Sequence, residues 1–234
     1  YDGARFYRYG EEEGLSAGKQ TVCQGSDGKL WIGTGGKVWR CTEQEFQPVA
    51  IESNSYVRKI QQDQEGRTWF CTGGGAFVYD GAQLQRFTAQ DGLAFNMVNA
   101  MCQDREGLLW FATWGGGLSC YDPHGLQVFG EGDGLPQSWH STLAEDRQGR
   151  VWVGSWEISS GGQGGRYLAR FEEGEFALLG EAEGLDLGAC YTLCEDREGQ
   201  LWLGGPRGLA RYEGDGFHRV GAAEGLGDIA VRAI

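Results

Sequence analysis

The stretch DREGLLWFATWGGGLSCYD, residues 104–122, recurs in altered form as DREGQLWLGGPRGLARYE, residues 196–213. Both copies pass from an Asp-x-x-Gly tetrapeptide into an apolar segment around a tryptophan, and then through a glycine-rich turn into a second apolar segment. A β-turn favours Asp at its first position and Gly at its fourth, so each copy predicts a β-hairpin. A chain that contains the same hairpin twice is expected to consist of structural repeats.

The repeat occurs five times and can be aligned on one tryptophan in each unit. These residues are Trp31, Trp69, Trp110, Trp152 and Trp202, which are 38, 41, 42 and 50 residues apart. A glycine precedes each tryptophan by three residues, and in four units an aspartate precedes it by six: Gly28, Gly66, Gly107, Gly149 and Gly199; Asp63, Asp104, Asp146 and Asp196. A period near 40 residues with room for four short strands is typical of the blades of a β-propeller.

The sequence therefore predicts an all-β fold, a β-propeller of four-stranded antiparallel blades. We expect five complete blades at residues 16–50, 51–88, 94–130, 136–180 and 186–221, in a single domain of residues 1–234. Partial strands are expected at 4–9 and 228–234, and because both ends cut the repeat, we expect a fragment of a larger propeller array. The repeated Trp, Gly and Asp residues are interpreted as scaffold, because each blade needs the next to bury its faces.

Composition and charge exclude several classes of function. The net charge is −13, which would repel a nucleic-acid backbone. No apolar run approaches the roughly 18 residues of a membrane span, so no membrane segment is expected in this piece. The seven cysteines include no C-x-x-C pair, and most occupy repeat-equivalent positions, which predicts buried free thiols rather than a metal site or disulfides.

The repeat resembles the two-component regulator propeller repeat, whose pattern is roughly D-x-x-G-x-Φ-W-Φ-G-T-x-x-G-G-Φ (Φ, apolar) with a later D-G-L. Residues 104–118 and 91–93 follow this pattern closely, and the resemblance covers essentially the whole chain. It implies a sensor domain of bacterial histidine kinases or hybrid regulators, joined to further blades and downstream signalling domains. It also implies a periplasmic location and, as in some members, a response to oligosaccharides. The unpaired cysteines leave a cytoplasmic location open.

Positions at which the repeats disagree are the candidates for ligand binding. Eleven residues before each tryptophan, at the start of the expected innermost strand, the residue is polar and different each time, and two tryptophans follow the Trp strand in one shared register. Flat aromatic and polar side chains on loops suit an oligosaccharide or another polar small ligand. The candidate ligand-binding residues are Arg58, Asn99, Trp114, Trp139, His140, Ser141, Trp156, Tyr191 and Arg232.

In this hypothesis Arg58 and Arg232 supply charge, Asn99 and Ser141 supply neutral polar contacts, and the tryptophans supply stacking surfaces. Two alternatives stay open. The polar positions could line a solvated channel without any ligand, and the tryptophans could pack between blades.

The sequence predicts no catalytic site, cofactor or metal. The three histidines occupy different registers, and the glycine-rich turns lack the Lys-Ser/Thr partner of a phosphate-binding loop. The predicted function is therefore a non-catalytic, ligand-sensing propeller of a bacterial two-component receptor. Two alternatives are a propeller enzyme such as a lyase, with His140 as its acid–base candidate, and a structural protein-interaction scaffold.

Overall fold

The computed structural model describes residues 10, 12, 15, 20–42, 45–51, 53, 55–136, 139–156, 167–221, 224–226 and 229–234. These residues form five four-stranded sheets, in each of which the strands lie side by side in sequence order. The all-β prediction of four-stranded antiparallel blades is confirmed. Three short 3-10 turns accompany the strands in the described part of the chain, and none of the described helices is long and apolar enough to cross a membrane.

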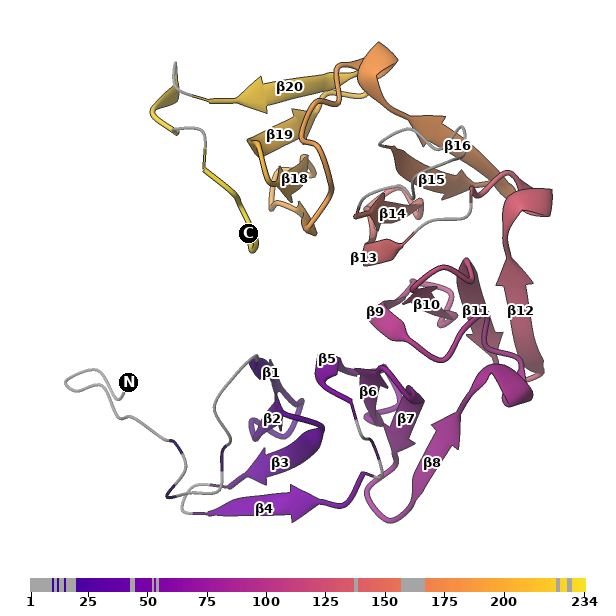
Figure 1. Ribbon diagram of the computed structural model, residues 1–234, viewed down its shortest axis with the longest axis vertical. Coiled ribbons are helices and arrows are strands. Elements are labelled where there is room, and N and C mark those ends of the chain that lie inside the picture. The colour runs from indigo at the N-terminus through magenta and orange to yellow at the C-terminus, as the bar shows by residue number, and fades with distance from the viewer. Residues whose placement is uncertain are drawn as a thin grey trace. The chain divides into compact units, whose positions relative to one another are not determined.

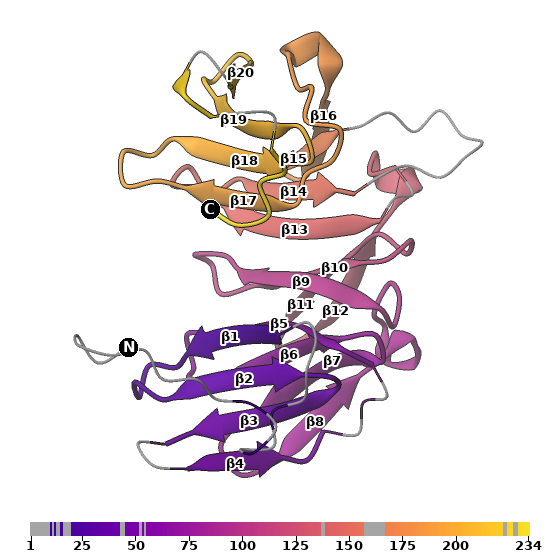
Figure 2. The ribbon, with the colours of Figure 1, turned by 60° about the vertical axis from the view of Figure 1, so that its left-hand side comes forward.

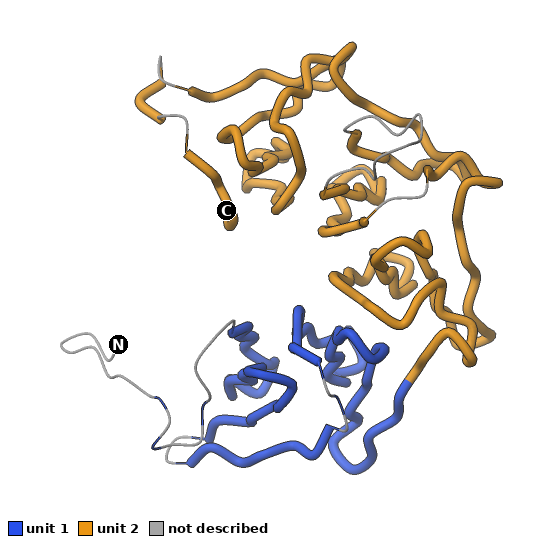
Figure 3. Tube along the Cα trace, viewed as in Figure 1, with its two compact units in different colours: residues 1–86 blue, residues 87–234 orange. Residues whose placement is uncertain are grey.

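The chain divides into two compact units, residues 1–86 and 87–234, which Figure 3 shows in different colours. Unit 1 contains two sheets. The first consists of β1 (Gln20–Gln24), β2 (Leu30–Thr34), β3 (Lys37–Cys41) and β4 (Phe46–Val49). The second consists of β5 (Val57–Gln62), β6 (Thr68–Thr72), β7 (Gly75–Tyr79) and β8 (Leu84–Phe87), whose last residue begins unit 2.

Unit 2 contains three sheets. They are β9 (Val98–Gln103), β10 (Leu109–Thr113), β11 (Leu118–Asp122) and β12 (Gly125–Phe129); β13 (His140–Glu145), β14 (Val151–Ser155), β15 (Leu168–Glu172) and β16 (Glu175–Leu179); and β17 (Thr192–Glu195), β18 (Leu201–Gly205), β19 (Gly208–Tyr212) and β20 (Phe217–Val220). The 3-10 turns are η2 (Ala89–Asp91), η3 (Glu131–Asp133) and η4 (Glu181–Glu183). Within this unit the first strands β9, β13 and β17 lie next to one another, and β12, β16 and β20 are the outer strands (Figures 1 and 2).

Each of the five sheets lies within one of the residue ranges expected for the blades. The expected partial strand at 4–9 lies outside the described residues. Residues 229–234 form no strand, but the Val231 N–H donates to the Gly205 carbonyl at 2.9 Å. This bond repeats the one that the Cys190 N–H donates to the Ser155 carbonyl between the last two sheets. Residues near Val231 thus lie where the next innermost strand would begin.

The Asp-x-x-Gly turn does more than reverse the chain. In β9–β10 the Gly107 N–H donates to the Asp104 carbonyl at 3.0 Å, and Gly107 adopts φ +89°, which favours glycine. The Asp104 carboxylate also accepts the Leu108 N–H at 2.8 Å and the indole N–H of Trp110 at 2.7 Å. Three other units make the same aspartate–indole bond, between Trp69 and Asp63, Trp152 and Asp146, and Trp202 and Asp196.

Three of the repeated tryptophans, Trp31, Trp110 and Trp152, lie in the core between neighbouring sheets of one unit. In unit 2, Trp110 packs against Phe171 and Trp152 against Tyr212, both with ring centroids 5.0 Å apart. In unit 1 the indole of Trp31 meets Tyr79 of the second sheet at 5.8 Å. Within each unit these contacts join the Trp strand of one sheet to the third strand of the next, so that one sheet covers the other.

Candidate functional site

Four aromatic rings of unit 2 form a continuous row that ends on an arginine. Trp139 packs against Trp114 in a tilted arrangement with ring centroids 4.6 Å apart, and Trp114 meets Trp156 edge-on at 6.1 Å. Trp156 meets Tyr191 edge-on at 5.6 Å, and the guanidinium carbon of Arg232 lies 5.0 Å from the centre of the Tyr191 ring. We call these five residues the aromatic row. It runs across the three sheets of unit 2 by way of their loops.

Backbone hydrogen bonds fix the tryptophans of the row. Trp114 directly follows β10 and forms a β-bridge with Trp139, which directly precedes β13. The Trp114 N–H donates to the Met97 carbonyl at 2.9 Å, and the Trp156 N–H donates to the Trp139 carbonyl at 2.8 Å. Pro206 occupies the same register in the last sheet and has no N–H to donate.

The row is only partly covered. Trp139 and Trp156 each expose 37% of their surface, Trp114 and Tyr191 are half-buried, and Arg232 is exposed. A cluster of partly exposed indoles offers a large flat contact area with little side-chain entropy to lose, which suits the binding of a ligand.

Two polar residues beside the row already bind the protein itself. The Asn99 side-chain amide donates to the His140 carbonyl at 2.7 Å, which links β9 to β13. The Ser141 hydroxyl lies 2.5 Å from the Cys190 carbonyl, an equivalent link to the next sheet. The repeat position that these two residues occupy, which varies from repeat to repeat, therefore supplies hydrogen bonds between neighbouring sheets. The Oδ1 atom of Asn99 is buried and accepts no hydrogen bond from the described residues.

His140 is enclosed. Its side chain has no solvent exposure, and neither ring nitrogen has a hydrogen-bond partner among the described residues. Burial lowers the pKa of His140 to about 4, so the imidazole is neutral near pH 7. A buried imidazole without a polar partner is not arranged for acid–base catalysis on a bound ligand.

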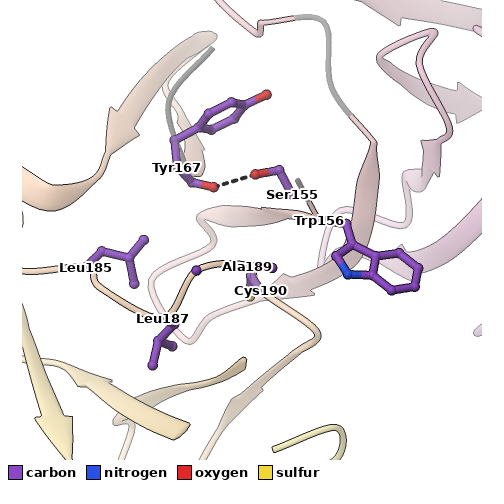
Figure 4. Close-up of a pocket in the computed structure, with 8 residues that line it drawn as sticks. Ser155, Trp156, Tyr167, Leu185, Leu187, Ala189 and Cys190 are labelled. Atoms are coloured by element: carbon purple, nitrogen blue, oxygen red, sulfur yellow. Dashed lines mark hydrogen bonds between the residues drawn. The ribbon is translucent and has the colours of Figure 1, made fainter. Parts of the chain in front are cut away.

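A small pocket adjoins the row at Trp156 (Figure 4). It has a volume of about 10 Å³, room for one water or one methyl group. Its apolar walls come from Leu185, Leu187 and Ala189, and the Ser155 hydroxyl at its edge donates to the Tyr167 carbonyl at 2.8 Å. The Trp156 indole points away from these side chains, so the pocket and the exposed rings are separate features.

Comparison with known protein families identifies the repeat. Three segments, residues 92–115, 134–157 and 184–207, match the family described as two component regulator propeller. Each segment begins at the glycine of a Gly-Leu loop and ends just after the Trp strand, so the three matches are in register. These three segments are two-component regulator propeller repeats. All three matched repeats contribute residues to the aromatic row or to its flanking loops.

Solved structures with a similar fold also contain propeller domains. The chain is 24% identical to the extracellular domain of a protein assigned as a hybrid two-component system from B. thetaiotaomicron, with a TM-score of 0.73 over 85% of this chain and 28% of that chain. A second extracellular domain from that organism, assigned to a one-component system, is 20% identical, with a TM-score of 0.70 over 87% of this chain and 31% of that chain. The chain thus spans less than a third of either relative. No curated protein matches the sequence.

A propeller enzyme shares the fold at greater sequence distance. Virginiamycin B lyase from Staphylococcus aureus is 12% identical, with a TM-score of 0.69 over 85% of this chain and 68% of that chain. At these identities each of the three likenesses concerns the fold.

The structure brings together most of the residues that the sequence proposed. Eight of them lie in unit 2, in the aromatic row or directly beside it: Asn99, Trp114, Trp139, His140, Ser141, Trp156, Tyr191 and Arg232. Arg58 lies on β5 of unit 1 and is not part of this cluster, and burial lowers the pKa of its guanidinium. Sequence reasoning did not find the pocket residues Ser155, Tyr167 and Leu187, because no single register or motif marks them.

Proposed function

We propose that the chain is part of the sensor region of a bacterial two-component receptor, and that it binds a polyhydroxylated or anionic ligand through the aromatic row. The observation that carries this proposal is the row itself, in which two partly exposed indoles lie beside a half-buried tyrosine and an exposed arginine. The propeller repeats support the sensor role.

The chemistry of the row favours one class of ligand. The faces of Trp139 and Trp156 can stack on the C–H faces of sugar rings, and Arg232 can donate hydrogen bonds to a carboxylate or sulfate at the other end. An apolar ligand would cover Arg232 without offering an acceptor to its guanidinium.

The five sheets are proposed to be successive blades of one propeller in a longer chain, placed outside the cytoplasm. The fold relatives that are extracellular domains of sensor proteins support this location. The buried thiols fit it as well, because burial raises the pKa of Cys71, Cys120 and Cys190 to about 12 and so suppresses the reactive thiolate.

Of the two alternative functions, the structural scaffold gains support from specific contacts. The side chains of Asn99 and Ser141 hydrogen-bond to backbone carbonyls of the neighbouring sheet, which favours a structural role for this position of the repeat. The lyase alternative depended on His140, whose buried imidazole cannot reach a ligand on the row while the sheets stay packed.

The decisive experiment measures binding of neutral and uronic-acid oligosaccharides to the intact sensor region by tryptophan fluorescence. We expect Trp156→Ala to weaken binding by about tenfold or more, as for a central aromatic contact. Leu178→Ala, an exposed apolar residue on the outer strand β16, is the matched control and should bind like the wild type. The proposal fails if no oligosaccharide binds, or if Trp156→Ala binds as tightly as the control.

A further inference from the structure

His140 occupies a position that is apolar in three of the other four repeats. Twelve residues before the repeated tryptophan stand Val57, Val98 and Cys190, and Val231 is next in register, whereas the first repeat has Lys19 there. Val57 and Val98 are fully buried, and so is His140. A histidine has thus replaced a small apolar side chain in a closed site.

The site is the seam between neighbouring sheets. A Cβ built on Gly33 would lie 2.7 Å from Val57, and one built on Gly154 would lie 2.9 Å from the Cβ of Cys190. The residue two places after each repeated tryptophan therefore faces the residue twelve places before the next one. This register sets His140 against the buried Ala112 of β10, and β10 packs against β13.

The imidazole in this seam has no polar partner. Neither nitrogen is hydrogen-bonded among the described residues, although one of them must carry a proton in the neutral ring. The imidazole is stable in this buried site only while it is uncharged. Burial alone lowers the pKa of His140 to about 4.

No charge on the packed strands compensates for a proton on His140. The strands β10 and β14 carry no titratable side chain, and β9 carries only Cys102. Glu145, at the far end of β13, is ion-paired with Arg105 at 2.9 Å. β17 contributes Cys194 and Glu195, whose carboxylate accepts the Arg147 N–H at 2.9 Å.

The same seam holds the first pair of the aromatic row in place. The His140 carbonyl accepts a hydrogen bond from the Asn99 side-chain amide at 2.7 Å, and the preceding residue, Trp139, packs against Trp114 with ring centroids 4.6 Å apart. Trp114 belongs to the sheet on one side of the seam and Trp139 to the sheet on the other. Separation of the two sheets at His140 would therefore separate the two indoles.

We infer that His140 is a positioning residue of the aromatic row, which holds Trp139 against Trp114 while its imidazole is neutral and releases the pair when acid protonates the ring in an opened seam. The biological meaning of this acid sensitivity rests on the proposed function, but the device itself does not. In an opened seam the imidazole regains its ordinary pKa of about 6.5. Acidification from pH 6.5 to 4 therefore shifts the closed–open equilibrium toward the open form by roughly 80-fold.

The test needs no ligand. Two indoles in close contact give an exciton couplet in the far-UV circular dichroism spectrum, and its loss in Trp139→Ala assigns it to this pair in the intact protein, because Trp139 contacts no other ring of the described residues. On titration from pH 7 toward pH 4 we expect the wild type to lose the couplet before the β-sheet signal is lost. His140→Val, which installs the residue found at positions 57 and 98, should keep the couplet over the same range while all carboxylates titrate as before.

His140→Cys, which installs the residue found at position 190, is the second variant and should behave like His140→Val. The inference is overturned if the wild-type couplet survives to pH 4, or if either folded variant loses it at the wild-type midpoint. It is also overturned if neither variant folds at pH 7, because the imidazole would then be needed for packing. Failure of oligosaccharide binding would count against the proposed function and leave this result untouched.

Discussion

Asp146 Oδ2 accepts the indole N–H of Trp152 at 2.6 Å, and the same oxygen accepts Arg150 Nε at 2.6 Å. The other carboxylate oxygen accepts the backbone N–H groups of Gln148 and Arg150. One buried carboxylate thus ties the turn, the following strand and the core indole together. The spacing of six residues between Asp and Trp in the repeat places the carboxylate within hydrogen-bonding distance of the indole N–H.

Replacement of this carboxylate should destabilise the protein more than replacement of an ordinary turn aspartate. We expect Asp146→Ala to lower the free energy of unfolding by about 2–4 kcal/mol, because it leaves a buried indole N–H without an acceptor and removes charge-assisted bonds. Asp80→Ala, which removes an exposed turn cap, should lower it much less. Urea unfolding of both variants tests this, and equal losses would contradict it.

Two tryptophan replacements should have opposite effects. Trp110→Ala should lower the free energy of unfolding by about 3–5 kcal/mol, because Trp110 is buried against Phe129 and Phe171. Trp156→Ala should cost about 1 kcal/mol or less, because Trp156 is partly exposed. Thermal unfolding of the two variants provides the measurement. Similar losses for both would mean that Trp156 is core rather than surface.

The aspartate–indole bond also predicts a titration shift. The Trp202 indole, followed by the Gln200 backbone N–H, holds the pKa of Asp196 below its ordinary value of 3.8. A lowered pKa in the folded state stabilises the protein above the unfolded pKa, and this contribution is lost as the pH falls through the folded pKa. Trp202→Phe should therefore raise the pKa of Asp196, measured by NMR titration of its carboxyl carbon. An unchanged pKa would show that the backbone bonds alone cause the shift.

The cysteines should be reduced but slow to react. All seven are free thiols, and burial raises the pKa of Cys71, Cys120 and Cys190 to about 12. We expect a thiol reagent to label seven groups in the denatured, non-reduced protein, with these three reacting last in the native state. Five or fewer groups after denaturation would reveal a disulfide.

The sequence predicted the sheets well because the repeat leaves several independent signals in each copy. The turn Asp and Gly, the alternation of apolar residues and the spacing of the tryptophans all predict the same hairpins. A prediction is reliable when turn signals, strand pattern and repeat spacing agree in this way. The aspartate–indole bond was not predicted, because a turn aspartate is already explained by its own backbone.

The functional site was harder to predict for physical reasons. Variation at the register of Asn99 and Ser141 indicated ligand contacts, but variation does not show whether a polar group faces a ligand or a neighbouring carbonyl. His140 was grouped with the loop residues because it follows Trp139. The apolar residues Val57, Val98 and Cys190 at the same position of three other repeats indicate that it is buried, although the first repeat has Lys19 there.

The amide of Cys190 and the carbonyl of Ser155 join two sheets, and Val231 and Gly205 repeat that bond. Only main-chain atoms take part, and every residue except proline supplies both of them. A gene segment that encodes one repeat can therefore be duplicated or exchanged, and its loops can acquire new side chains, while the joint between modules is kept. Evolution can in this way change the ligand that a propeller binds while the hydrogen bonds between its sheets stay the same.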